Sequence, residues 1–213
     1  MQHITLGGVD ADGQAAVNEL SHLVLEATAS VDFIRCISVR LGKASPPEFV
    51  QHCCELIARC GGIPFIFNDD CFIPALTDRG ITLEDARNYA PIGCIELTVP
   101  GKANPHAASG WFNSLKCLEL AIFDGCDPRT GRQMGPHTGS LVELDSFEAF
   151  FAAYCQQVET FAHRMVNCCN HGERAQQVGG PLPCWSVMTD DCIARGRDIT
   201  DGGAVYNYQS VCF

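Results

Sequence analysis

The sequence predicts an α/β fold, because segments typical of strands and segments typical of helices alternate along the chain. No internal repeat and no low-complexity linker separates these segments, so we expect them to form one domain. The chain has 213 residues, of which 46% are hydrophobic and 18% are charged. This composition allows a buried core and excludes a disordered chain.

The first elements follow from apolar spacing and helix caps. Residues 15–29 place apolar side chains at helical intervals, and residues 37–41 alternate as a short strand. Ser45, followed by two prolines and a glutamate, predicts the N-terminal cap of a helix that ends near Arg59. We therefore expect a helix, a strand and a second helix in this order.

The next elements surround the most distinctive motif of the chain. Residues 64–67 form a short apolar run, which predicts a buried strand that leads into a polar loop at residues 68–70. Thr82, with Asp85 three residues later, predicts the cap of a short helix. Residues 92–97 then predict one further strand.

The remaining elements are mostly helical. We expect a helix over residues 107–123, a long loop over 124–138, a last helix over 190–195 and a strand over 204–208. Asp145 and Glu148 predict a capping box for the clearest helix of the chain. Its apolar residues form one stripe at helical spacing, which is typical of a core-facing surface, and they are Phe147, Phe150, Phe151, Tyr154, Val158, Phe161 and Met165.

Charge and hydropathy restrict the partners. The formal net charge is −11, which opposes general binding to nucleic acid or to an anionic membrane. No apolar run reaches the roughly 18 residues that a membrane-spanning helix requires, and the N-terminus carries no basic segment of the signal-peptide type. We therefore expect a cytoplasmic protein that acts on a small molecule, with no nucleic-acid partner and no membrane.

The 14 cysteines need a separate explanation, because a chain of this length does not depend on disulfides for stability. None of them forms the C-x-x-C pair that is typical of zinc or redox sites. We expect most of them to be small buried hydrophobic residues in a reducing cytosol, and at most one or two to be chemically special. A cysteine-rich metal binder remains as an alternative that bound zinc in the purified protein would support.

Cys94 and Glu96 are the candidate catalytic residues. In an extended strand, side chains two residues apart share a face and lie about 6.6 Å apart, so a substrate carbon could lie between this thiol and this carboxyl group. Sulfur could then remove hydrogen while the acid transfers a proton. From spacing alone, a buried cysteine beside an exposed glutamate is the more frequent arrangement.

Several stretches of the chain together resemble the pyruvate formate-lyase-like glycyl radical enzymes, especially their dehydratase and lyase branch. The most specific stretch is Gly93-Cys94-Ile95-Glu96 followed by Val99-Pro100-Gly101-Lys102. The others, in chain order, are Gln2 to Asp10, Ser38-Val39-Arg40, Phe67-Asn68-Asp69-Asp70, Ile73-Pro74-Ala75-Leu76, Asp191 to Arg197 and Gly202 to Asn207. Their order and spacing extend the resemblance over nearly the whole chain.

The resemblance implies that residues 1–213 are a partial pyruvate formate-lyase domain. The fold would be part of the ten-stranded α/β barrel of glycyl radical enzymes, incomplete in this chain. Cys94 would be the thiyl-radical cysteine, and Glu96 would be the acid/base. Pyruvate formate-lyase itself is similar elsewhere but carries paired cysteines at this point. Because Gly93 replaces the first of them, the resemblance favours radical cleavage of a C–O, C–N, C–S or C–C bond, dehydratase-like, over acetyl transfer to coenzyme A.

The chain also departs from the family. It lacks the Arg-Val-x-Gly-Tyr-type motif of the radical glycine and the N-terminal half of the barrel, and Arg35-Cys36 replaces a Pro-Asn-like pair. We therefore expect no bound cofactor here. The glycyl radical would lie in trans or in the missing C-terminal segment, installed by a radical SAM activating enzyme.

The partners implied by the resemblance are the missing N- and C-terminal barrel segments, the radical SAM activase and, for the full-length enzyme, a homodimer. The isolated chain is expected to be inactive. An alternative is a catalytically inactive product of a truncated or split gene that acts only as an assembly partner. A partial barrel exposes strand edges and core faces, so poor solubility is expected until a partner covers them.

Overall fold

The structure is a computed structural model that describes residues 3–31, 36–92, 96–104, 108–207 and 210–212. Helices and strands alternate along it, as the sequence predicts. The elements are β1 (Ile4–Gly7), α1 (Glu19–Ala29), β2 (Ile37–Leu41), α2 (Pro47–Arg59), β3 (Phe65–Asn68), α3 (Asp69–Thr77), α4 (Leu83–Arg87), β4 (Ala90–Ile92), β5 (Glu96–Thr98), β6 (Ala108–Trp111), α5 (Ser114–Ile122), β7 (Cys126–Asp127), β8 (Arg132–Gln133), α6 (Phe147–Gly179), α7 (Pro183–Val187), α8 (Cys192–Arg195), the 3-10 helix η1 (Ile199–Asp201) and β9 (Ser210–Cys212).

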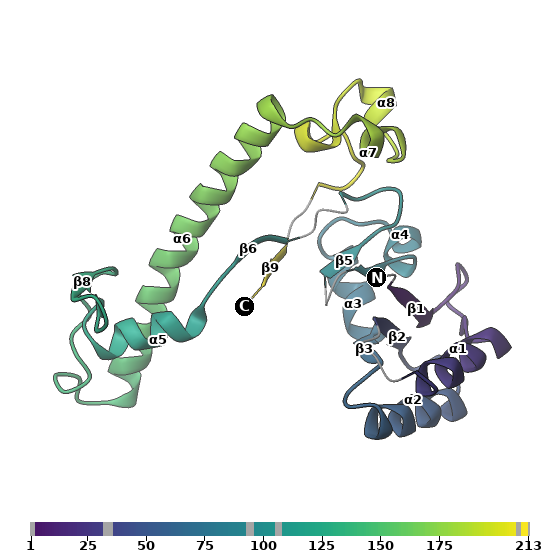
Figure 1. Ribbon diagram of the computed structural model, residues 1–213, viewed down its shortest axis with the longest axis horizontal. Helices are drawn as coiled ribbons and strands as arrows, with labels where there is room; N and C mark the ends of the chain where they lie inside the picture. Colours follow the sequence, from purple (N-terminus) through teal and green to yellow (C-terminus); the bar gives the residue numbers. More distant parts are fainter. Residues whose placement is uncertain (1–2, 32–35, 93–95, 105–107, 208–209, 213) are drawn as a thin grey trace.

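Figure 1 shows two groups of elements connected by extended chain. The first group, which we call the N-terminal lobe, contains β1 to β5 and α1 to α4, within residues 3–104. The second, the helical arm, contains α5 to α6, residues 114–179. Beyond the far end of α6, the chain returns through α7 and α8, and β9 pairs with β6 in the parallel direction.

The N-terminal lobe is built on a parallel sheet of order β1-β2-β3. Ser38 of β2 pairs with Thr5 of β1 on one side and with Phe65 of β3 on the other. Because β2 is the middle strand of the three, all five of its residues are buried. Helices α1 and α2 pack against each other, and a core of Leu25, Val39, Leu41, Phe49, Cys53 and Leu56 fills the space beside the sheet.

Local signals explain where the helices of the lobe begin. The helix expected from residue 15 begins at Glu19, because Asn18 and Ser21 form a capping box there. The prediction of Ser45 as the cap of α2 was wrong. Pro46 holds the cap position, and the Ser45 hydroxyl instead accepts a hydrogen bond from the backbone of Gly42. The predicted Thr82 cap of α4 is confirmed, since its side chain accepts from the Asp85 amide.

Two further predictions for the lobe were wrong. The polar residues after β3 do not form a loop, because Asn68 caps α3 and Asp69 and Asp70 form its first turn. β3 was expected to be a buried strand, yet of its four residues only Phe67 is buried. It pairs with β2 on one side, and among the described residues no further strand extends the sheet beyond it. An edge strand leaves its outer side uncovered.

The second half of the chain differs more from expectation. The helix expected over residues 107–123 is divided into β6 and the shorter α5, and the loop expected over 124–138 contains the small hairpin of β7 and β8. In place of the strand expected over 204–208, the described residues 204–207 contain one bridge, at Tyr206, and β9 begins at Ser210.

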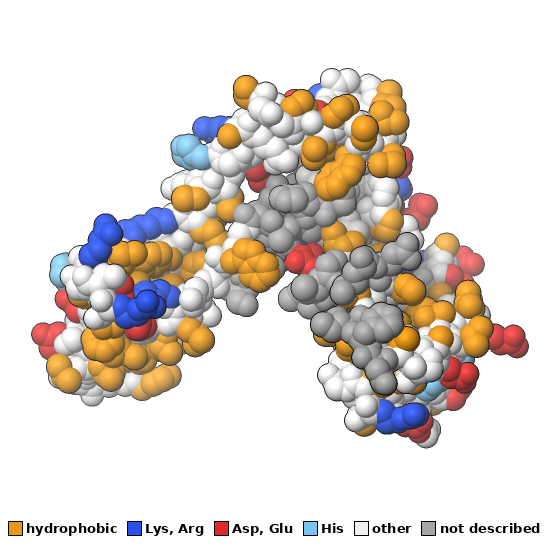
Figure 2. Space-filling model, in the orientation of Figure 1, with side chains coloured by type: hydrophobic (Ala, Val, Ile, Leu, Met, Phe, Trp, Pro, Cys, Tyr) orange, Lys and Arg blue, Asp and Glu red, His pale blue; other side chains and the backbone are white. Residues whose placement is uncertain are grey.

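Helix α6 has 33 residues, which makes it about 50 Å long. Its cap is Ser146 rather than the predicted Asp145. The prediction that its apolar stripe is core was wrong for this chain: α6 buries only Ala153 and Gln157, and Phe147 is 71% exposed. Figure 2 shows hydrophobic side chains at the surface of the helical arm. Helix α5 packs against α6, yet the stripe stays incompletely covered: Phe147 and Phe151 are exposed and its other residues are half-buried.

Candidate functional site

The segment that carries the predicted catalytic pair is a hairpin rather than one strand. β4 and β5 are antiparallel, and their register places Ile92 opposite Glu96. Residues 93–95 connect the paired ends, and Cys94 lies outside the described residues. The expected single strand over 92–97 was therefore wrong, because Ile92 and Glu96 belong to two paired strands. The prediction that Cys94 and Glu96 share a face falls partly outside the described residues.

Glu96 is the first residue of β5, and its side chain is half-buried. It lies at the end of the hairpin next to residues 93–95, where it pairs with Ile92. The other end packs firmly, because Val99 is completely buried among Phe67, Tyr89 and Ala103, with Leu97 against the same cluster. The hairpin therefore has an anchored base, and Glu96 lies at its opposite end.

A buried charged cluster fixes the start of β4. Arg40 of β2 binds both carboxylate oxygens of Asp69 in α3, at 2.9 and 2.8 Å. Its third arm donates to the backbone carbonyl of Tyr89 at 2.9 Å, and the guanidinium carbon lies 4.0 Å from the centre of the Tyr89 ring. The Tyr89 hydroxyl donates to Asp69 at 2.8 Å. Tyr89 immediately precedes Ala90, the first residue of β4.

The protonation state of Tyr89 suits its role as a hydrogen-bond donor to Asp69. Burial, followed by the hydrogen bond to Asp69, raises the pKa of Tyr89 above its usual value of 10. The phenol therefore stays protonated at neutral pH and remains a donor to the carboxylate. Because Arg40 and Asp69 are both buried, this pair is held by several directed hydrogen bonds in a dry environment.

A second polar cluster holds the chain that follows β5. Asp85 of α4 accepts from the Lys102 ammonium and from the Tyr206 hydroxyl, each at 2.6 Å. Burial alone would raise the pKa of Asp85, but the hydrogen bonds from Lys102, Tyr206 and Thr82 outweigh it and lower the pKa below 3.8. The Tyr206 amide also donates to the Lys102 carbonyl. The C-terminal segment is thereby attached to the N-terminal lobe next to the hairpin.

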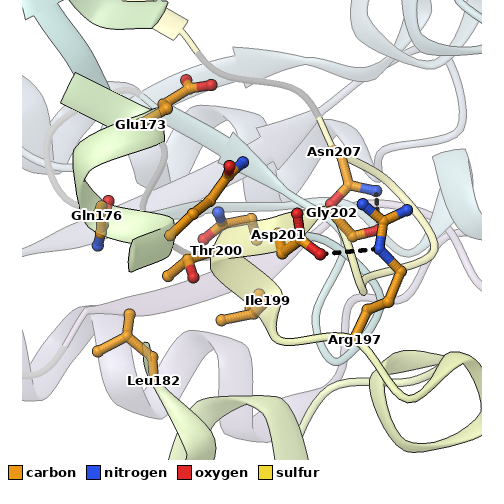
Figure 3. A pocket seen from close by; sticks show the side chains of 11 residues that line it. Glu173, Gln176, Leu182, Arg197, Ile199, Thr200, Asp201, Gly202 and Asn207 are labelled. Atoms are coloured by element: carbon orange, nitrogen blue, oxygen red, sulfur yellow. Dashed lines mark hydrogen bonds and ion pairs between the residues drawn. The ribbon is translucent and has the colours of Figure 1, made fainter. Parts of the chain in front are cut away.

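A polar pocket of about 300 Å³ lies between the end of α6 and the C-terminal segment. Figure 3 shows Glu173 and Gln176 of α6 on one side and Arg197 facing Asp201 on the other. None of the residues that line it comes from β4 or β5, and the guanidinium of Arg197 is already paired with Asp201. We therefore do not assign the predicted chemistry to this pocket.

The cysteines of the described residues are less buried than the sequence predicts. Among the cysteines whose side chains the structure describes, only Cys53, Cys117 and Cys192 are buried, and burial raises the pKa of each thiol, for Cys53 to about 11. The exposed cysteines are Cys54, Cys71, Cys155, Cys168 and Cys184, so the expectation that most are core residues was wrong. Within the part of the chain that the structure describes, no three His, Cys, Asp or Glu side chains form a group suited to a metal ion.

Reasoning from the sequence missed the two polar clusters that hold the hairpin. Their members are separated by 29 residues for Arg40 and Asp69, and by 121 for Asp85 and Tyr206, so no local spacing rule connects them. A signal did exist, because Arg40, Asp69 and Tyr206 all belong to stretches that carry the family resemblance.

Known proteins resemble this chain over nearly all of its length. A family model described as pyruvate formate lyase-like matches residues 1–213. The (2S)-3-sulfopropanediol dehydratase of Klebsiella oxytoca is 36% identical over 97% of this chain, and the trans-4-hydroxy-L-proline dehydratase of Clostridioides difficile is 33% identical over 96%.

Solved structures agree with these matches. The chain superposes on the B12-independent glycerol dehydratase of Clostridium butyricum in its glycerol-bound form with a TM-score of 0.87 and 38% identity, over 99% of this chain and 27% of that one. The chain likewise spans about a quarter of the length of the curated relatives it matches, at 25% and 26% for the two dehydratases. Among the described residues, no helix has the length and apolar character needed to span a membrane.

Proposed function

Because this chain belongs to the pyruvate formate lyase-like family, whose matched relatives include glycyl radical dehydratases and lyases, we propose that it is the cysteine-bearing section of such an enzyme. The observation that carries the proposal is the hairpin of β4 and β5, in which Ile92 and Glu96, the residues on either side of 93–95, pair with each other and the base is anchored in a buried core. In this proposal Cys94 and Glu96 are the catalytic residues.

The proposed chemistry divides between the thiol and the carboxyl group. A glycyl radical outside this chain, installed by a radical SAM activase, would take the hydrogen atom of the Cys94 thiol. The Cys94 sulfur would then take a hydrogen atom from an inert C–H bond of the substrate. The neighbouring carbon loses its hydroxyl group, to which Glu96 gives the proton that makes it water, and the hydroxyl group on the radical carbon releases its own proton, which restores the Glu96 acid. Cys94 returns its hydrogen atom to the product radical, so the sum is loss of one water molecule with Cys94 and Glu96 regenerated.

Dehydration of a small hydroxylated molecule is the reaction class that the relatives favour. Those matched most strongly are named as dehydratases of sulfopropanediol and of hydroxyproline, and the solved structures include dehydratases of glycerol and of 1,2-propanediol. Less similar relatives are named isethionate sulfite-lyase and indoleacetate decarboxylase. We therefore propose C–O cleavage ahead of C–S or C–C cleavage.

The test uses the full-length enzyme formed by this segment and the remaining barrel segments, activated anaerobically. We expect Cys94→Ala and Glu96→Gln to abolish dehydration of a vicinal diol while the glycyl radical, measured by electron paramagnetic resonance, still forms. The matched controls are Cys71→Ala and Glu84→Gln, which change an exposed cysteine and an exposed glutamate of the same lobe and should retain activity. Substantial turnover by the Cys94 variant would remove the assignment.

A second candidate is a non-catalytic assembly partner, and one observation favours it. The helical arm exposes large apolar side chains, among them Leu115 of α5 at 75% and Val142 just before α6 at 94%. Such surfaces are typical of faces that another chain segment covers. If the full-length assembly forms and carries the glycyl radical, yet turns over none of the tested substrates, this second function is favoured instead.

A further inference from the structure

Three segments that are far apart in the sequence converge on the Arg40 side chain. Asp69 of α3 and Tyr89 before β4 bind its guanidinium through directed hydrogen bonds, as described above. The third segment is the turn after β1, where Gly8 lies against the guanidinium and its amide donates to the main-chain carbonyl of Arg40 at 2.8 Å. Arg40, Asp69 and Gly8 belong to stretches that resemble the family, but the proposed chemistry at Cys94 gives none of them a role.

Gly8 makes room for the guanidinium. Its φ is +84°, and a Cβ atom at this position would lie 2.8 Å from the Arg40 guanidinium carbon and 2.9 Å from Nε. Any other residue would therefore be strained in the backbone and would push the guanidinium away from its partners. Gly7 is similarly close, because a Cβ there would lie 2.6 Å from the Arg40 carbonyl oxygen.

The guanidinium connects this turn to the hairpin through a hydrogen bond to the Tyr89 carbonyl, which is followed by a short stretch of main chain. The carbonyl that Arg40 holds belongs to Tyr89, and three residues of β4 separate Tyr89 from the connection that contains Cys94. At the other end of that connection, Glu96 is held in register opposite Ile92. A shift of the Tyr89 carbonyl would therefore be transmitted along β4 to both ends of the motif.

We propose that Arg40 is a positioning residue that sets the approach of the Cys94–Glu96 hairpin, with Asp69, Tyr89 and Gly8 fixing its guanidinium. This inference rests on the proposed function, since Arg40 acts only through the two residues assigned there. A misplacement of about 1 Å in a catalytic group can cost on the order of a hundredfold in rate. Arg40 would consequently affect the rate of the chemical step far more than the binding of substrate.

Two variants isolate the positioning role. Arg40→Lys keeps the positive charge beside Asp69, but a single ammonium cannot reproduce the planar fork that holds Asp69 and the Tyr89 carbonyl together. Gly8→Ala keeps Arg40 and displaces its guanidinium. The matched control is Gly80→Ala, because Gly80 has nearly the same φ, +87°, and no atom within 4 Å of an added Cβ. Backbone strain is thus equal, and only the contact with Arg40 differs.

In the activated full-length enzyme, we expect Arg40→Lys and Gly8→Ala to lower kcat at least about tenfold, with KM and glycyl radical content unchanged. Gly80→Ala should retain the wild-type kcat. In the 213-residue chain, hydrogen exchange should become faster over residues 90–98 in the first two variants and stay unchanged in the control. A wild-type kcat in Arg40→Lys, an equal loss in both glycine variants, or unchanged exchange over 90–98 would each overturn the proposal.

Failure of the proposed function gives a different result. If wild-type enzyme carrying its radical shows no turnover, or if Cys94→Ala remains active, the assignment of the catalytic pair fails. The exchange experiment still decides whether Arg40 holds the hairpin, because it requires no turnover. If either variant fails to fold, Tyr89→Phe serves in its place: it removes only the hydroxyl donor to Asp69 and should give a smaller change of the same kind.

Discussion

The N-terminal lobe and the helical arm differ in how their apolar surfaces are covered. In the lobe, all five residues of β2 are buried, and a charged pair lies inside the core. In the arm, a helix of 33 residues buries two. The lobe therefore contains a well-buried core, whereas the described residues of the arm leave most of its long helix exposed. The hairpin of β4 and β5 belongs to the lobe.

The largest expected contrast comes from removing one phenylalanine in each region. Phe49 in the lobe is fully buried, whereas Phe147 in the arm is 71% exposed. We expect Phe49→Ala to lower the free energy of unfolding by about 3–5 kcal/mol, because it leaves a cavity. Phe147→Ala should change it by less than about 0.5 kcal/mol. Urea unfolding of the two variants measures both values, and equal losses would mean that the arm is packed as firmly as the lobe.

Hydrogen exchange compares the two regions without substitution. Amides of β2 should exchange at least about a hundredfold more slowly than those of the last turns of α6, because local opening of α6 exposes little new apolar surface. Val178 there is 89% exposed, while Val39 of β2 is fully buried. Mass spectrometry of peptides from the two elements gives the rates. Similar protection in both would show that α6 is held by more than its contacts with α5.

The C-terminal segment provides a pH test of intermediate size. Burial alone would raise the pKa of Asp198, but hydrogen bonds from Thr200, Leu182 and Ser186 lower it to about 2. Since folding lowers this pKa, the stabilisation is complete above the usual value of 3.8 and is lost as the pH falls towards 2. After allowance for solvent screening, its size is on the order of 1 kcal/mol.

Asp198→Asn should therefore remove part of the loss of stability between pH 4 and pH 2, as thermal unfolding across this range would show. Asp190→Asn changes an exposed carboxylate of the same segment and should leave the pH profile as in the wild type. A profile that is identical in the wild type and the Asp198 variant would mean that this carboxylate does not hold the segment.

The smallest effect is expected at an exposed ion pair. The distance between Nη2 of Arg195 and Oδ2 of Asp191 is 2.6 Å, but the two side chains are 43% and 41% exposed. Arg195→Gln should change stability by less than about 0.5 kcal/mol, and added salt should reduce even this difference. A large loss of unfolding free energy in this variant would contradict the distinction drawn between this surface pair and the buried Arg40–Asp69 pair.

The elements that the sequence predicted well are those with local causes. The alternation of Ile37 to Leu41 predicted β2, and the Thr82 hydroxyl predicted the start of α4, because both signals act within a few residues. The hairpin was missed because apolar residues continue from Ile92 to Leu97, so the pattern alone predicts one strand. The reversal depends on pairing between residues that the pattern cannot connect.

The arm could not be predicted for a different reason. The stripe that begins at Phe147 has the spacing of a core face, but a pattern does not tell which chain segment covers that face. Similarly, the Arg40–Asp69 pair depends on the parallel sheet that brings β2 next to α3. The stretches that carry the family resemblance contain Arg40 and Asp69 without assigning either a role, and the structure shows that the two residues bind each other.

The central claim is that Cys94 exchanges hydrogen with the substrate, and an isotope experiment tests it most directly. The full-length enzyme is activated and supplied with glycerol or propane-1,2-diol deuterated at the carbon that loses hydrogen. If Cys94 carries out this transfer, turnover is slower than with the undeuterated substrate, and deuterium appears in the product at the carbon that lost its hydroxyl group. Cys94→Ser then forms no product although the glycyl radical is present. Product formation by Cys94→Ser at the wild-type rate, with no isotope effect, would contradict the claim.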